Sequence, residues 1–130
     1  MAVCLILLTL ASIIYFYRGL YFIPRRNSIV VRTGSAVDQL TSKESLVVAA
    51  YGASPIQLYY CNRKGWAFNL DQKDEAAMIG QLENYRDQKA AYFVTTELDR
   101  LHASALLDRH LKTHYSVLKK TDDYIIYKLA

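Results

Sequence analysis

The stretch that decides the fold is LVVAAYGASPIQ, residues 46–57. Its first six residues are an apolar run without alternation, which is typical of a strand buried on both faces, as in a parallel sheet. Gly52 ends the run. Ser54, Pro55 and Gln57 then give the pattern of a helix start, with a serine N-cap, a proline in the first turn and a capping-box glutamine. The sequence therefore predicts a buried strand followed directly by a short helix.

Strand and helix signals continue to alternate on both sides of this stretch. The other predicted elements are a helix over 28–40, a strand over 66–68, a helix over 71–88, a strand over 90–94, a helix over 96–111 and a hairpin of strands over 115–119 and 124–129. Strands that alternate with helices indicate the α/β class. We therefore predict a three-layer, Rossmann-like domain over residues 27–130, with a mostly parallel sheet to which the C-terminal hairpin adds an antiparallel edge.

The N-terminal segment has a different composition. Residues 2–17, AVCLILLTLASIIYFY, are apolar except for Thr9 and Ser12. A helix here, extended by the apolar residues that follow, has the length to cross a hydrocarbon core of about 30 Å. We therefore expect residues 1–26 to be a transmembrane helix with a basic flank. A cleaved signal peptide is the alternative, although no Lys or Arg precedes Arg18.

The net charge of +4 is concentrated next to the apolar segment, at Arg18, Arg25 and Arg26. Residues 27–130 carry 13 Lys and Arg against 12 Asp and Glu. A nucleic-acid partner needs a basic patch on the domain itself, so none is expected. The arginines lie where anionic lipid headgroups would be, so membrane lipid is the expected partner. By the positive-inside rule, they place the domain in the cytoplasm.

Aromatic and basic residues gather around one predicted turn. Tyr59, Tyr60, Arg63, Lys64 and Trp66 are the candidate ligand or headgroup contacts. Aromatic faces stack on sugar rings, and Arg and Lys hold phosphate. In the alternative interpretation, Tyr59 and Trp66 belong to the core, and Arg63 and Lys64 form a solvated turn.

Other motifs give no catalytic chemistry. The strand-to-helix turn at 52–55 has one glycine, and Pro55 removes a backbone donor, so a phosphate loop is not expected. His110 and His114 are four residues apart but lack the HExxH pattern of a zinc helix, and no GxSxG motif is present. We therefore predict no catalytic residue, no metal ligand and no cofactor.

Several short segments resemble a known module. They are LVVAAYG (46–52), SP (54–55), LYY (58–60), NRKGW (62–66), AAYFV (90–94) and IIYKL (125–129). Through them, residues 32–129 resemble the C-terminal soluble domain of bacterial multi-spanning glycosyltransferases of family 39. These enzymes are relatives of the dolichyl-phosphate-mannose protein mannosyltransferases and the aminoarabinose lipid A transferases. The most specific part of the resemblance is 58–66.

The resemblance implies a non-catalytic accessory domain, with the last membrane helix, of a glycosyltransferase that uses a polyprenyl-phosphate sugar. It also implies an extracytoplasmic location, against the charge rule above. The family carries its catalytic acids in a loop that this chain lacks, so no catalytic residue is carried over. Two alternatives are a stand-alone membrane-anchored module that binds a protein partner, and a small nucleotide-binding enzyme.

Overall fold

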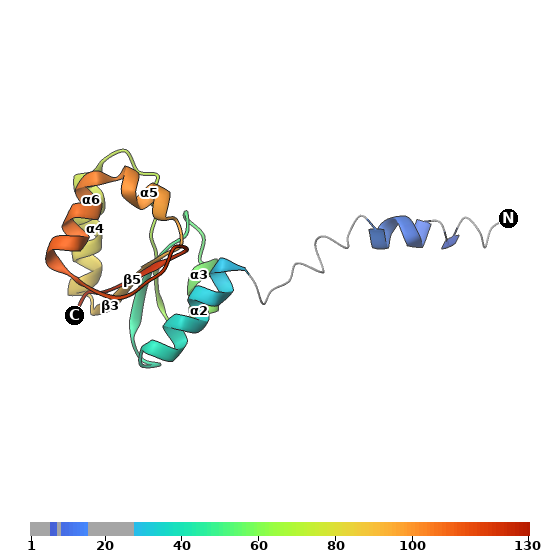
Figure 1. Cartoon of the computed structure of the whole chain (residues 1–130), viewed down its shortest axis with the longest axis horizontal. Helices are drawn as coiled ribbons and strands as arrows, with labels where there is room; N and C mark the ends of the chain where they lie inside the picture. Colours follow the sequence, from blue (N-terminus) through green and yellow to red (C-terminus); the bar gives the residue numbers. More distant parts are fainter. Residues whose placement is uncertain (1–5, 8, 16–27) are drawn as a thin grey trace.

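The computed structural model describes residues 6–7, 9–15 and 28–130 (Figure 1). In chain order, the elements of the domain are α2 (Ile29–Leu40), β1 (Leu46–Ala50), α3 (Ile56–Cys61), β2 (Gly65–Ala67), α4 (Glu75–Asp87), β3 (Ala90–Thr95), α5 (Leu98–Ala103), α6 (Ala105–His114), β4 (Ser116–Lys120) and β5 (Ile125–Lys128). Helices and strands alternate along the chain as far as α5, which is followed directly by α6 and then by the final pair of strands. The predicted α/β class is therefore confirmed.

The five strands form one sheet in the order β2-β1-β3-β5-β4. Strand β1 is parallel to both β2 and β3, whereas β5 is antiparallel to both β3 and β4. The sheet is mixed, with as many antiparallel as parallel pairings, so the prediction of a mostly parallel sheet is wrong. The reason is that β5 lies inside the sheet, where the C-terminal hairpin contributes two antiparallel pairings.

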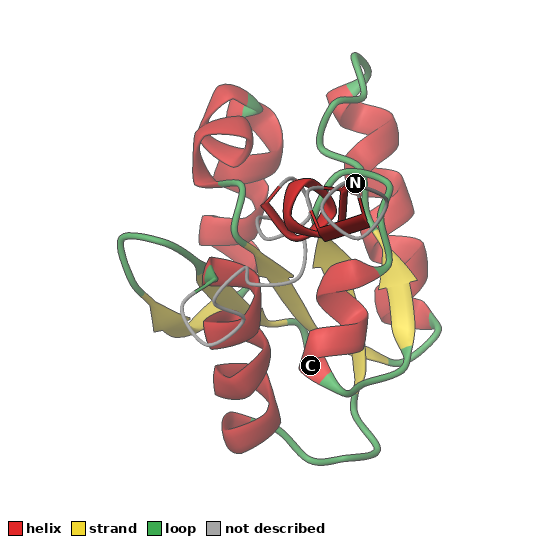
Figure 2. Cartoon of the chain, turned by 90° about the vertical axis from the view of Figure 1, so that its right-hand side faces the viewer, coloured by secondary structure: helices red, strands yellow, loops and turns green. Residues whose placement is uncertain are grey.

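Helices cover both faces of the sheet, as Figures 1 and 2 show. Successive residues of a strand point to opposite faces, which divides the core in two. Val47 and Ala49 of β1 pack in the smaller cluster, which includes Val37 of α2 and Cys61 of α3. Val48 and Ala50 belong to the larger cluster, which includes residues of α4, α5 and α6. The strand predicted from residues 46–51 is thus buried on both faces.

Helices α2 and α3 approach each other closely on the first face. A Cβ atom added to Gly34 of α2 would lie 2.3 Å from the carbonyl oxygen of Tyr60 in α3. A side chain at this position would overlap the backbone of the neighbouring helix. Gly34, which weakens the helix pattern in the sequence, is therefore the residue that lets α2 pack against α3.

The prediction of a single helix over 96–111 is wrong. The chain forms two helices here, α5 and α6, which meet at Ser104. The second one, α6, has no side-chain cap of its own. Instead, Oε2 of Glu75 in α4 accepts the backbone N–H of Leu106 at 2.7 Å and that of Leu107 at 3.3 Å. A carboxylate from another helix thus satisfies the free donors of this helix start.

The prediction of a transmembrane helix over residues 1–26 is contradicted. Among the described residues, no helix is both long and apolar enough to cross a membrane. The helical residues 9–15 would span about 10 Å at 1.5 Å per residue, against a hydrocarbon core of about 30 Å. Residues 1–5, 8 and 16–26 of the predicted helix lie outside the described residues. The predicted membrane location is corrected on the same ground.

Candidate functional site

The candidate residues lie on α3, on the turn that follows it and on β2. Helix α3 ends at Asn62, which adopts the left-handed conformation with a φ of 51°. Its N–H bonds back to the carbonyl oxygens of Leu58 and Tyr59. Such a C-cap suits asparagine, whose short polar side chain tolerates this region. The polar turn predicted from the sequence thus brings the chain from α3 into β2.

The side chain of Arg63 is buried and hydrogen-bonded within the domain. The exposed fraction of its side chain is 0%, and Nη1 contacts the Asp38 carboxylate at 2.6 Å. Its Nε donates to the Thr41 hydroxyl at 3.2 Å, and Nη2 donates to the Thr41 carbonyl at 2.8 Å. Further acceptors are the carbonyl oxygens of Asp38, Cys61 and Asn62. Every N–H of the guanidinium therefore has an acceptor within the protein, and Arg63 fastens the end of α2 to the turn after α3.

The partner carboxylate of this clamp, Asp38, lies at the protein surface. It also pairs with Lys43, whose Nζ is 2.6 Å from Oδ1. Hydrogen bonds from Lys43 and then from Arg63 lower the pKa of Asp38 below its ordinary value. The carboxylate is therefore ionised at neutral pH and balances the buried guanidinium.

The side chains of Tyr60 and Trp66 also pack within the domain. The Trp66 ring stacks on Tyr85 of α4 with 4.9 Å between ring centroids and 15° between planes. Trp66 is partly buried against the larger core cluster. Tyr60 is partly buried too, and it meets the ring of Tyr59 edge-on at 5.3 Å. The ring of Trp66 therefore packs β2 against α4, and the ring of Tyr60 packs against Tyr59 on α3.

We predict that Trp66→Ala will lower the free energy of unfolding by about 2 kcal/mol, because a partly buried ring and its stacking contact with Tyr85 are lost. Denaturant unfolding of the full chain measures the change. The control is Tyr59→Ala, since residue Tyr59 is 79% exposed; it should cost about 0.5 kcal/mol, as is usual at the surface. Equal losses for the two variants would contradict a packing role for Trp66.

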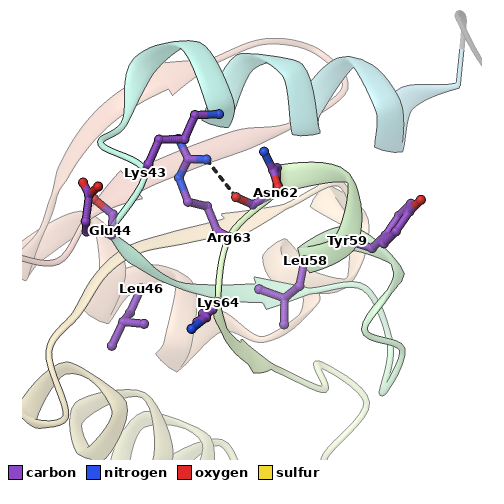
Figure 3. A pocket seen from close by; sticks show the side chains of 9 residues that line it. Lys43, Glu44, Leu46, Leu58, Tyr59, Asn62, Arg63 and Lys64 are labelled. Carbon is purple, nitrogen blue, oxygen red and sulfur yellow. Dashed lines mark hydrogen bonds between the residues drawn. The ribbon is translucent and has the colours of Figure 1, made fainter.

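Tyr59 and Lys64 remain exposed at a groove of about 630 Å³. The groove lies between the loop before β1 and the segment from α3 to β2. Its lining residues are Lys43, Glu44, Ser45, Leu46, Leu58, Tyr59, Asn62, Arg63 and Lys64. Figure 3 shows Glu44 and Leu46 at one end, Tyr59 at the other, and Leu58 and Lys64 between them. The groove thus combines aliphatic side chains with an exposed phenol and an ammonium group.

Lys64 differs from its cationic neighbours in the charge contacts of its side chain. Both Lys43 and Arg63 are paired with Asp38, whereas Lys64 forms no ion pair with any residue that the structure describes. The exposed amide of Asn62 lies in the same groove. Lys64 is therefore the cation of this groove that is available to an anionic ligand.

A second position of interest is the carboxyl end of the parallel strands. The connections from β1 to β2 and from β2 to β3 run in opposite directions along the sheet, so the ends of β1 and β3 form a topological switch point, where open α/β sheets bind ligands. Here Oε2 of Glu97 accepts the N–H of Gly52 at 2.9 Å. The protein's own carboxylate thus takes the backbone donor that a phosphate would need.

The adjoining hollow, about 320 Å³, is acidic as well. Glu97, Asp99, Asp122 and Asp123 line it, together with Arg100, whose guanidinium is paired with Glu97 and Asp71. Negative charge around the crevice repels phosphate groups. This geometry argues against the nucleotide-binding alternative.

The histidines form contacts within the protein. Nε2 of His110 lies 2.8 Å from Oε1 of Glu83, and the His114 ring stacks on His110 at 4.3 Å. The Tyr115 hydroxyl also donates to Glu83. Burial and then the Glu83 carboxylate raise the pKa of Tyr115 to about 12. Among the described residues, no group of three or more His, Cys, Asp or Glu side chains is arranged to hold a metal ion.

Comparison of the chain with protein-family models, with curated proteins and with solved structures gave no match. The class that the fold and the groove define is a small α/β domain with a mixed sheet. Its candidate ligand contacts are Tyr59, Asn62 and Lys64.

Sequence reasoning missed two parts of this site. Leu58 and Asn62 lie in the groove because the left-handed turn folds α3 back toward β2. The basic turn itself was visible in the sequence, but nothing there distinguishes Arg63 from Lys64. Asp38, near the end of the preceding helix, is the acidic residue that could have suggested a paired arginine. That Arg63 is its partner becomes evident only when α2 and α3 are packed together.

Proposed function

We propose that the domain binds a sugar phosphate in the groove beside α3 and has no catalytic activity of its own. Through the resemblance of residues 58–66, we assign it as an accessory domain of a glycosyltransferase that uses a polyprenyl-phosphate sugar. The observation that carries the proposal is that Lys64, which forms no ion pair with a described residue, lies in the same groove as the exposed Tyr59.

The chemistry of a sugar phosphate matches these side chains. An aromatic ring offers its face to the apolar face of a sugar, while its hydroxyl bonds with sugar hydroxyls. An ammonium group holds phosphate as a point charge, and an amide both donates and accepts hydrogen bonds. The aliphatic side chains of Leu46 and Leu58 supply the apolar part of the groove. A shallow surface groove of this kind supports weak binding, with a Kd of about 1 mM.

The prediction is tested by NMR titration of the full chain with mannose 1-phosphate, with free mannose and inorganic phosphate as separate ligands. We expect shifts at Tyr59, Asn62 and Lys64 that saturate at millimolar mannose 1-phosphate. Lys64→Ala should weaken binding about fivefold, the factor that corresponds to about 1 kcal/mol for one exposed charge contact.

The matched control is Lys73→Ala, an exposed lysine outside the groove. It removes the same charge from the protein and should leave the Kd unchanged. If both variants weaken binding equally, the protein attracts phosphate by its net charge alone. If mannose 1-phosphate causes no shift in the groove at 10 mM, about ten times the expected Kd, the sugar-phosphate proposal fails.

A further inference from the structure

Strand β4 forms an open edge of the sheet. It is the last strand in the order β2-β1-β3-β5-β4, and β5 is its neighbour. All five of its residues, Ser116–Lys120, are exposed. An edge strand presents a row of backbone N–H and C=O groups to any extended chain that can pair with it. The opposite edge, β2, has three residues, so β4 offers the longer template.

The side chains of β4 are apolar at its start and basic at its end. Val117 is 48% exposed and Leu118 is 38% exposed. Lys119 and Lys120 form no ion pair within the described part of the chain; Nζ of Lys119 lies 6.0 Å from the centroid of the Tyr124 ring. The edge therefore offers two aliphatic contacts and two positive charges that no described acidic residue neutralises.

A hollow of about 270 Å³ lies beside this edge, between α2 and β4. Its lining residues are Val31, Arg32, Ser35, Ala36, Gln39, Lys119 and Tyr124. Arg32 is already paired with Asp123 of the hairpin turn at 2.8 Å. Peptides that add a strand to a sheet gain affinity from main-chain hydrogen bonds and specificity from pockets that take alternate side chains. Strand β4 and this hollow provide both features.

From this arrangement we infer that β4 and the hollow beside α2 bind an extended acidic segment of another protein. The segment adds a sixth strand to the sheet. Its acidic side chains pair with Lys119 and Lys120, and its apolar side chains contact Val117 and Leu118. This surface is separate from the groove beside α3, since none of the residues lining that groove lines the hollow or belongs to β4, so the inference does not depend on the proposed sugar-phosphate function.

The charges of the edge favour an acidic partner over a second copy of this chain. Pairing of two β4 strands would bring two lysines from each copy into one interface, and like charges across a sheet are destabilising. Lysines on an edge are a common device against self-association. The β-bulge between Val117 and Lys119 also makes the strand irregular, which hinders pairing with an identical edge.

The experiment measures amide hydrogen exchange and NMR shifts of the full chain with a synthetic ten-residue peptide, in which five Val are followed by five Glu. The Val half can then lie beside Val117 and Leu118, and the Glu half presents carboxylates on both faces of the strand, to Lys119 and Lys120. We expect slower exchange for amides of residues 116–120 and shifts at Val31 and Ala36. The double variant Lys119→Glu with Lys120→Glu should bind at least tenfold more weakly. The control Lys73→Glu with Lys89→Glu makes the same change of charge on exposed residues outside the edge and should leave the Kd unchanged.

Three results would overturn the inference. The first is equal binding of the same peptide with every amide N-methylated, since that peptide has no backbone N–H left to pair with an edge strand. The second is equal protection by an oligonucleotide of the same charge, which would reveal attraction to any polyanion. The third is protection of residues 116–120 by raising the protein concentration alone, with dimers seen in sedimentation equilibrium. In that case the edge pairs with a second copy of the chain.

Discussion

Gly65→Ala is expected to lower the free energy of unfolding by about 4 kcal/mol, from strain of 1–3 kcal/mol and overpacking of similar size. The φ angle of Gly65 is 152°, in a region that L residues rarely adopt. An added Cβ would also lie 1.8 Å from the carbonyl oxygen of Val47 on the paired strand β1. The added Cβ would be held by its own backbone, and the atom that it meets belongs to the backbone of β1. No side-chain rotation can therefore relieve the overlap.

Denaturant unfolding of the full chain, with circular dichroism to follow secondary structure, measures this loss. The matched control is Gly80→Ala in α4, where an added Cβ meets nothing within 4 Å. That change should stabilise the protein by about 0.5–1 kcal/mol, since alanine is the better helix former. A loss below about 1 kcal/mol for Gly65→Ala would mean that β2 can shift along β1 at small cost, because even one strained residue costs 1–3 kcal/mol.

The elements that the sequence predicts well are those whose signals are local. Residues 46–50 form a continuous apolar strand, and the structure buries this strand on both faces, as the pattern indicated. Helix α4 was predicted over 71–88, and it begins at Glu75 with Asp74 as its N-cap, four residues later than predicted. Boundaries of this kind depend on which of several acidic residues caps the helix, and Asp71 and Asp74 are equally good candidates by sequence.

The features that could not be predicted depend on contacts between distant residues. Thr96 and Asp99 have the spacing of a capping box, but the helix begins at Leu98 and the Glu97 carboxylate accepts the N–H of Gly52, 45 residues away. Likewise, α6 begins where it does because Glu75 caps it from α4. The antiparallel pairing of β5 with β3 is a property of the whole sheet. No local pattern records these choices.

The N-terminal segment was assigned from composition alone, and this is where the prediction failed. An apolar run gives the hydrophobicity that a membrane helix needs, but a spanning helix also needs continuous length. The described part of that run is helical over residues 6–7 and 9–15, and the large side chains of those residues are exposed, including Leu10 at 50% and Ile14 at 64%. Without a spanning helix, the positive-inside rule has no bearing on the flanking arginines. Membrane lipid as a partner stays a prediction.

Arg63→Ala should lower the free energy of unfolding by about 3 kcal/mol, because a buried guanidinium that satisfies several backbone carbonyl oxygens is removed. The guanidinium has six acceptors, and four of them are backbone carbonyl oxygens, of Asp38, Thr41, Cys61 and Asn62. Alanine leaves those oxygens without their donor and opens a cavity between α2 and the turn after α3. Arg63→Lys should also be costly, at about 2 kcal/mol, because an ammonium group has three donors on one atom and cannot reach acceptors on both sides of the clamp.

Lys64→Ala is the matched control, since it removes the same charge from the next residue of the same turn. Lys64 is exposed and has no ion-pair partner among the described residues, so its replacement should change stability by about 0.5 kcal/mol or less. Chemical denaturation followed by circular dichroism measures all three variants under one set of conditions. The two neighbouring basic residues thus separate by experiment into one that holds the fold and one that is free to bind. If Arg63→Ala were as mild as Lys64→Ala, the clamp would contribute nothing, and Arg63 would return to the set of possible ligand contacts.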